Sequence, residues 1–206
     1  MRFAELDAVT LDAHGTLVEL ANPVPELDRC LRERRIKRGG QEIARAFATE
    51  VDYYREHAHE GRDAETLARL RLECTGVFLG ALEAELAPDD FVEAFVGSIR
   101  FEALPGTRRS LRALQRRGLA LAVISNWDVD LHAHLDEAGL GGLAVVTSAE
   151  AGAPKPATAV FELAVQRLGV RRDRTLHVGD SEADEVGAGA AGLRFAPAPL
   201  ATVLDA

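Results

Sequence analysis

The chain has 206 residues, of which 47% are hydrophobic, and a formal net charge of −9 at pH 7. That length and composition allow one large domain, or a core with an insertion, to bury a substantial interior. The negative charge repels nucleic acids and anionic lipids, so we expect a small-molecule partner and neither nucleic acid nor membrane. No apolar run approaches the roughly 20 residues that span a bilayer, and the N-terminus lacks a signal pattern. We expect a cytoplasmic protein, either a monomer or a homodimer.

Five short apolar segments predict buried β-strands, because aliphatic and β-branched residues dominate them. They are residues 8–11, 119–124, 143–146, 175–178 and 193–196. Four segments with helical spacing lie among them, and a glycine closes each one: residues 107–117, 129–138, 156–168 and 181–191. Strands that alternate with helices favour a parallel sheet covered on both faces. The predicted fold class is therefore α/β, with a doubly wound parallel sheet.

Residues 18–100 interrupt this alternation. Apart from a few turn signals, the segment is helix-forming throughout, with apolar residues at mixed three- and four-residue spacings. We interpret it as an all-helical insertion, which leaves residues 1–17 and 101–206 to form the core around the sheet. The basic stretch 32–38 inside the insertion is interpreted as a solvated helix face rather than a binding patch.

Polar side chains follow four of the predicted strands, at the edge of the sheet where ligands of parallel sheets bind. In chain order they are Asp12, His14 and Thr16, then Ser125 and Asn126, then Lys155, and finally Asp180 and Asp184. Three carboxylates at one edge would repel one another unless a cation lay between them, and their hard oxygen atoms suit Mg²⁺. A metal, an ammonium and a hydroxyl together would stabilise the oxygens of a transferring phosphoryl group.

The use of lysine supports a role for Lys155. Only two of the 24 Lys and Arg residues are lysines, Lys37 and Lys155, so arginine serves almost everywhere that a plain positive charge is needed. A compact ammonium fits a crowded metal and phosphate site where a planar guanidinium does not. We therefore predict that Lys155 is functional.

Four short motifs follow one another along the chain: Asp-x-x-Gly-Thr-Leu from residue 12, Ser-Asn at 125–126, Pro-Lys-Pro at 154–156 and Gly-Asp-Ser-x-x-Asp at 179–184. In this order they resemble the haloacid dehalogenase-like (HAD) hydrolase superfamily. The resemblance spans nearly the whole chain and implies a Rossmann-like catalytic core with a helical cap inserted after the first motif. It also implies a Mg²⁺-dependent phosphatase that acts on a small phosphate ester through an aspartyl-phosphate.

The resemblance implies a role for each polar residue. Asp12 would be the nucleophile, which splits hydrolysis into two easier steps. Ser125 would hydrogen-bond the phosphoryl oxygens, and Lys155 would neutralise them while it holds the nucleophile. Thr16 and Asn126 would steady the two loops that form the substrate-binding site.

The same resemblance implies a set of metal ligands. Asp12, Asp180 and the backbone carbonyl of His14 would bind Mg²⁺, and Asp184 would bind it directly or through water. Because residue 14 would contribute its backbone, its side chain does not decide whether the metal binds.

The side chain of His14 is where the chain departs from the phosphatase pattern, which has an aspartate there as general acid and base. A positioned acid or base contributes roughly 10²–10⁴-fold to the rate, so its loss would leave a slow enzyme. Histidine titrates near neutral pH and can serve as an acid or base. Three interpretations stay open for His14: acid/base, substrate contact, or packing of the loop.

Two other functions stay open. The dehalogenase branch of the family also lacks aspartate at this position and works without metal, so a haloacid dehalogenase is one alternative. The other is a catalytically degenerate member of the family that serves as a binding protein. A dehalogenase that works without metal does not need the paired acids Asp180 and Asp184. A binding protein would have no reason to keep Asp12, Lys155 and Asp180, whose acids repel one another.

Overall fold

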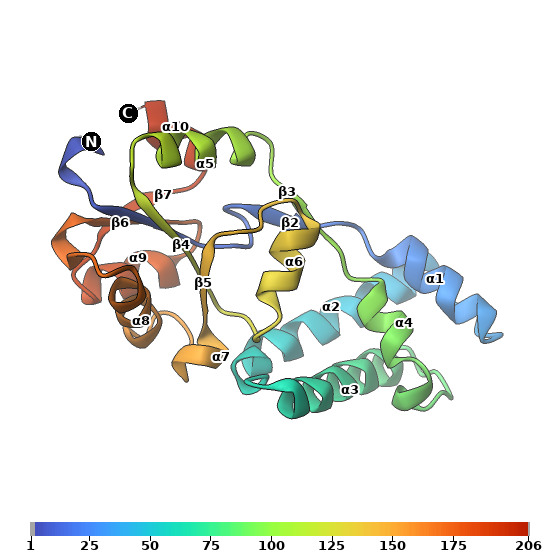
Figure 1. Ribbon diagram of the computed structural model, residues 1–206. Coiled ribbons are helices and arrows are strands. Elements are labelled where there is room, and N and C mark those ends of the chain that lie inside the picture. Colours follow the sequence, from blue (N-terminus) through green and yellow to red (C-terminus); the bar gives the residue numbers. More distant parts are fainter. Residues whose placement is uncertain (1–2, 206) are drawn as a thin grey trace. The chain divides into compact units, whose positions relative to one another are not determined.

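The computed structural model describes residues 3–205 (Figure 1). The chain forms two compact units: one contains the residues up to Glu19 together with those from Phe101 onward, and the other contains Leu20–Arg100. The first unit holds a five-stranded sheet, and the second is built from helices. No helix among the described residues is long and apolar enough to cross a membrane.

The five-stranded sheet is parallel, and β1 lies at its centre. Its strands, in the spatial order β5-β4-β1-β6-β7, are Ala144–Thr147, Ala120–Ser125, Ala8–Leu11, Thr175–Gly179 and Arg194–Pro197. All four residues of β1 are buried, as expected for a strand with neighbours on both edges and helices on both faces. Because β1 pairs with β4 and with β6, the loops that follow these three strands lie next to one another.

Helices cover both faces of this sheet. They are α5 (Thr107–Arg116), α6 (Leu131–Glu137), α7 (Ser148–Ala151), α8 (Ala159–Leu168), α9 (Glu182–Ala190) and α10 (Leu200–Asp205), with 3₁₀ turns at Phe3–Glu5 and Arg172–Arg174. Figure 1 shows α5 and α10 on one side of the sheet and α8 and α9 on the other. Phe161 of α8 packs with Ile124 of β4 and Ala188 of α9 in the buried core. The predicted α/β class, with its doubly wound parallel sheet, is confirmed.

A small two-stranded sheet lies where the chain passes between the units. It pairs β2 (Val18–Leu20) with β3 (Phe101–Ala103). The expectation that residues 18–100 are helical throughout is wrong at this point. Val18 is buried and Glu19 is exposed, which is the alternation of a strand with one covered face.

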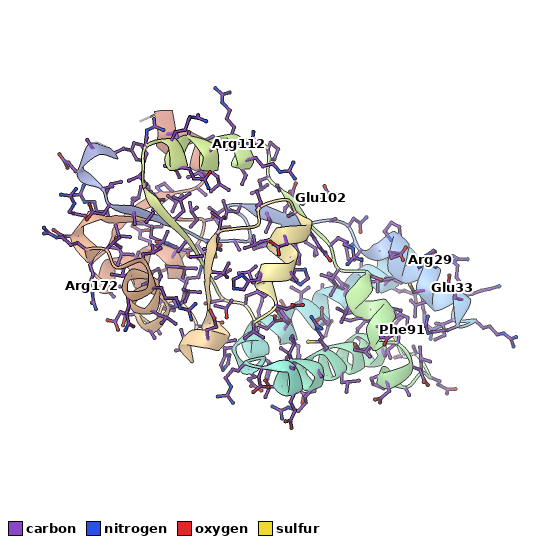
Figure 2. All side chains as sticks on the ribbon, in the orientation of Figure 1. Arg29, Glu33, Phe91, Glu102, Arg112 and Arg172 are labelled. Atoms are coloured by element: carbon purple, nitrogen blue, oxygen red, sulfur yellow. The ribbon has the colours of Figure 1, made fainter. Side chains whose placement is uncertain are left out.

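The helical unit has its own hydrophobic core. Its helices are α1 (Val24–Glu33), α2 (Gly40–His57), α3 (Ala64–Ala81) and α4 (Val92–Gly97), with 3₁₀ turns at Ala58–Glu60 and Pro88–Asp90. The ring of Phe78 lies 5.0 Å from that of Phe95 and 6.2 Å from that of Phe91, and all three side chains are fully buried. Charged side chains remain outside, such as the ion pair of Arg29 with Glu33 along α1 (Figure 2).

Candidate active site

Asp12 lies in the loop directly after β1, with its side chain buried. Its Oδ1 atom accepts a hydrogen bond of 3.0 Å from Ser125 Oγ, at the end of the neighbouring strand β4. The same oxygen accepts a hydrogen bond of 2.6 Å from Lys155 Nζ. The structure therefore brings Asp12 together with two residues that stand 113 and 143 positions away along the chain. Oδ1 is therefore held by two donors.

Lys155 is buried between two carboxylates. Its Nζ atom lies 2.6 Å from Asp12 Oδ1 and 2.5 Å from Asp184 Oδ1, and 3.5 Å from the carbonyl oxygen of Ile124. Burial by itself would lower the pKa of Lys155, but the charges of Asp12 and Asp184 outweigh burial and raise it. The ammonium is therefore charged at neutral pH and compensates both acids.

Asp184 lies in the first turn of α9 and is fully buried. Its Oδ1 accepts from Lys155 and from His177 Nε2 at 3.0 Å, and its Oδ2 accepts from the hydroxyl of Ser181 at 2.5 Å and from the backbone N–H of Ser181 at 3.2 Å. Burial would raise the pKa of Asp184, but the hydrogen bond from His177 and the charge of Lys155 lower it. Asp184 is therefore an ionised carboxylate that accepts four hydrogen bonds.

Asp180 completes an acidic cluster. One carboxylate oxygen from each of Asp12, Asp180 and Asp184 lies within 4.8 Å of the other two. Burial, followed by the like charges of Asp12 and Asp184, raises the pKa of Asp180. A divalent cation would remove that repulsion, and hard oxygen donors are the ligands that Mg²⁺ prefers. The donor set and its electrostatics therefore fit a magnesium ion.

Gly15 lets the loop after β1 approach this cluster. Its φ is +79°, and a Cβ atom at this position would lie 1.9 Å from Asp180 Oδ2. A residue with a side chain would have to adopt the left-handed conformation and also displace the carboxylate. Two physical requirements therefore favour glycine at position 15: the left-handed backbone of the turn and the close approach of Asp180. The sequence indicates only the turn.

Thr16, Asn126 and His14 differ in their burial and in their hydrogen bonds. Asn126 uses both ends of its amide on the backbone of Lys155: Oδ1 accepts from the N–H at 2.6 Å and Nδ2 donates to the carbonyl at 3.2 Å. Thr16 is buried, and its hydroxyl has no hydrogen-bond partner among the described residues. His14 is exposed in the loop, where its backbone forms a bridge with Val18. The substrate contacts of these residues stay predictions.

Two buried residues of the site are absent from the residues that the sequence singles out. His177 of β6 contacts Asp184, and its Nδ1 lies 3.0 Å from Thr10 Oγ1 of β1. The sequence favours a packed core residue at 177 because it stands inside an apolar strand. The signal that could have identified His177 as a site residue is its position two residues before the Gly-Asp motif, on a strand next to β1.

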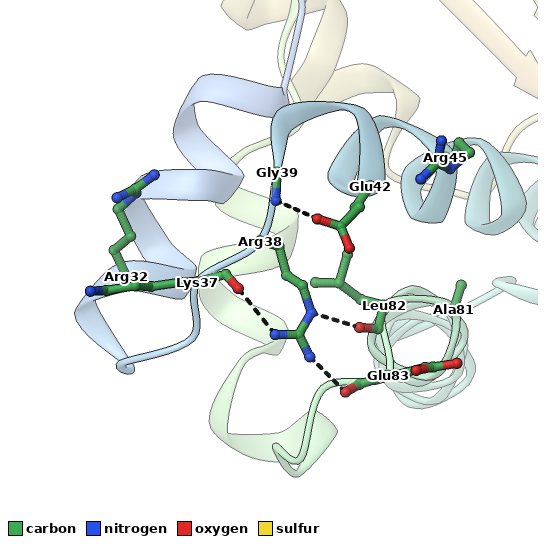
Figure 3. A pocket seen from close by; sticks show the side chains of 9 residues that line it. All are labelled: Arg32, Lys37, Arg38, Gly39, Glu42, Arg45, Ala81, Leu82 and Glu83. Carbon is green, nitrogen blue, oxygen red and sulfur yellow. Dashed lines mark hydrogen bonds between the residues drawn. The ribbon is translucent and has the colours of Figure 1, made fainter.

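The helical unit holds a separate hollow of about 610 Å³ (Figure 3). Its basic lining residues are Arg32, Lys37, Arg38 and Arg45. Arg38 donates to the carbonyls of Leu82 and Glu83 at the end of α3, at 3.0 and 2.8 Å. Glu42 accepts from the N–H of Gly39 and so covers the first turn of α2. The expectation that residues 32–38 form a solvated helix face is wrong: α1 ends at Glu33, residues 34–38 lie in the connection to α2, and the Arg38 guanidinium binds backbone carbonyls instead of water.

The comparisons with known proteins agree with this geometry. A model of the haloacid dehalogenase-like hydrolase family matches residues 6–192, so the chain belongs to that family. It is a hydrolase, and both phosphatases and dehalogenases are among the proteins that it resembles.

Three similar proteins represent these groups. A phosphoglycolate phosphatase from Rhodospirillum rubrum is 32% identical, over 90% of this chain and 76% of that protein. The L-2-haloacid dehalogenase structure from Xanthobacter autotrophicus with chloropropionic acid covalently bound has a TM-score of 0.66 and 26% identity, over 93% of this chain and 77% of that one. Haloacid dehalogenase-like hydrolase domain-containing protein 3 from Mus musculus is 38% identical over 45% of this chain, but the match spans only 38% of that protein.

Proposed function

We propose that this hydrolase is a Mg²⁺-dependent phosphatase that acts on a small phosphate ester through a covalent intermediate on Asp12. The observation that carries the proposal is the cluster of three carboxylates, Asp12, Asp180 and Asp184, with their oxygens within 4.8 Å. Such a cluster is unfavourable at Asp180, whose pKa is raised by burial and by the like charges of Asp12 and Asp184. It becomes favourable when it holds a cation and a phosphoryl group.

Asp12 would supply the nucleophile. Its carboxylate would attack the phosphorus atom, the bond from phosphorus to the ester oxygen would break, and the alcohol would leave with a proton. Water would then attack the aspartyl-phosphate, release orthophosphate and regenerate the carboxylate. Lys155 and Ser125 hold Asp12 in place, and Lys155 also places a positive charge where phosphoryl oxygens would lie.

Asp12 and Asp180 would hold Mg²⁺ with the backbone carbonyl of His14, and the bound ion would neutralise charge on the phosphoryl oxygens. Asp184 would act through water, because its two oxygens already accept four hydrogen bonds. The side chain of His14, exposed on the same loop, would give the proton to the leaving alcohol. The helical unit would act as a cap that selects the substrate.

The first experiment measures hydrolysis of an aryl phosphate with Mg²⁺, after chelation, and after Mg²⁺ is added back. We expect activity that disappears on chelation and returns with the metal. Asp12→Asn removes the attacking charge and should reduce turnover to background, with an unchanged circular dichroism spectrum. Asp173→Asn is the matched control, because Asp173 is an exposed acid that pairs with Arg171 at the surface. Activity that survives chelation, or turnover by Asp12→Asn, would refute the phosphatase mechanism.

A dehalogenase is the second candidate, favoured by the absence of an aspartate at position 14 and by the similarity to the Xanthobacter autotrophicus structure. Halide release from a 2-haloacid, measured in the presence of a chelator, decides between the two. Faster release of halide than of phosphate would favour the dehalogenase. A screen of phosphorylated metabolites with Mg²⁺ would then identify the substrate if phosphate is released.

A further inference from the structure

A continuous line of buried hydrogen bonds runs from the sheet to the nucleophile. Thr10 Oγ1 lies 3.0 Å from His177 Nδ1, and His177 Nε2 lies 3.0 Å from Asp184 Oδ1. Asp184 contacts Lys155, which contacts Asp12. Thr10, His177 and Asp184 are each fully buried.

This line depends on the register of two strands. Thr10 of β1 stands directly opposite His177 of β6, so their side chains share one face of the sheet. Both strands are otherwise apolar at the centre of the sheet, where a polar group costs stability unless it is hydrogen-bonded. A core that needed only volume at position 177 would be filled by an apolar side chain. Phe161 packs edge-on to the imidazole at 5.0 Å and would pack equally well against leucine.

The partners of His177 determine which nitrogen carries its hydrogen. Asp184 is ionised and can only accept, so Nε2 must donate to it. The Thr10 hydroxyl lies against Nδ1 on the other side of the ring, and a hydroxyl can donate to that nitrogen or accept from it. Both ring nitrogens of His177 therefore have a buried partner.

We propose that His177 is a positioning residue of the active site: it holds the Asp184 carboxylate in the orientation that keeps Lys155 against Asp12, and Thr10 holds the other side of its ring. Its effect on turnover rests on the proposed function, whereas its effect on Lys155 does not. Groups that orient the ligands and charges of an active site in this way typically contribute 10–100-fold to activity.

The first test observes the imidazole directly by NMR of protein labelled with ¹⁵N-histidine. The signal of His177 is assigned by its loss in His177→Gln. We expect hydrogen on Nε2 at pH 7. A ring without hydrogen on Nε2 would overturn the proposal, because only an N–H at that atom can donate to the ionised Asp184.

The second test observes Lys155. In a Lys37→Arg background Lys155 is the only lysine, so ¹³C-labelled lysine gives a single side-chain environment. His177→Leu should shift the Lys155 signal and reduce phosphatase turnover by about 10–100-fold. His177→Gln keeps an N–H that can reach Asp184, and it should restore both readouts most of the way. If folded His177→Leu keeps the parental Lys155 signal and activity, the proposal is wrong.

A third test, Thr10→Val, leaves His177 in place and so does not depend on how well that residue can be replaced. It removes only the hydroxyl at nearly constant shape, and we expect a shifted Nδ1 signal of His177 and a shifted Lys155 signal. Thr175→Val is the matched control: Thr175 is a buried threonine of β6 whose hydroxyl donates to the Arg171 carbonyl, outside this line. Equal signals in both threonine variants would overturn the proposal. If the NMR signals respond as expected but no phosphate ester is hydrolysed, the proposed function fails and the positioning role stands.

Discussion

The burial of Glu50 leads to a prediction about stability that is independent of the active site. The side chain lies on α2 inside the helical unit and is only 3% exposed. Burial raises its pKa from 4.5 to about 7, and a hydrogen bond with Cys74 offsets only part of that rise. A tenfold change in an ionisation equilibrium is worth about 1.4 kcal/mol, so the ionised carboxylate destabilises the folded state by roughly 3 kcal/mol.

The direction of the pH dependence follows from the two pKa values. Below pH 4.5 Glu50 is protonated in the folded and the unfolded chain, and it has no effect. As the pH rises toward 7, the unfolded chain loses this proton first, so stability falls across that window and is then constant. Glu50→Gln keeps the shape and is neutral at every pH. We expect its free energy of unfolding to exceed that of the parent by up to roughly 3 kcal/mol at pH 8 and to equal it near pH 4.

Urea denaturation at both pH values measures this difference. Circular dichroism follows the helices, and fluorescence of Trp127, the single tryptophan, follows the unit that contains the sheet. Glu56→Gln is the matched control, because it makes the same change at an exposed position of α2. A Glu50→Gln effect that is the same at pH 4 and pH 8 would refute the reasoning, since only ionisation distinguishes the two conditions.

Three further predictions concern the active site. Gly15→Ala should abolish most activity in a folded protein, because its Cβ would displace Asp180, whereas Gly118→Ala, with a similar φ of +75° and open space around it, should keep full activity. Lys155→Met should lower the free energy of unfolding by roughly 3–5 kcal/mol in urea denaturation, because it leaves two buried carboxylates unpaired, while Lys37→Arg should not. His14→Ala should slow hydrolysis of an alkyl phosphate by about 10² or more relative to an aryl phosphate, whose leaving group needs no proton; equal slowing in steady-state assays would make His14 a packing or positioning residue.

The elements of the sheet could be predicted because local signals determine them. Four of the five predicted strands differ from the observed ones by one residue at one or both ends, and β1 agrees at both ends. Gly169 ends α8 in the left-handed conformation, with φ of +65°, which a sequence of apolar residues followed by glycine indicates directly. The strand at Val18–Leu20 was missed because three residues carry too little periodicity to distinguish a strand from the start of a helix.

The contacts inside the site could be predicted only in part. That Asp12, Ser125, Asp180 and Asp184 meet at one edge follows from the strand order of a parallel sheet. That Asp184 accepts hydrogen bonds from both Lys155 and His177 does not follow from the strand order, because it depends on the register of β1 against β6. A shift of one residue would turn either Thr10 or His177 to the opposite face. The sequence identifies both strands but contains no local signal for their register.

Lys155 shows how composition and geometry support one another. An ammonium has three N–H donors, and the structure offers it three acceptors: Asp12 Oδ1, Asp184 Oδ1 and, at the longer distance of 3.5 Å, the Ile124 carbonyl. A guanidinium has five donors in a rigid plane, so in this space two of them would be buried without acceptors. Arginines such as Arg112 and Arg172 lie instead on exposed helical surfaces, where water satisfies the remaining donors (Figure 2). The lysine is retained at position 155 because its hydrogen bonds can all be made there.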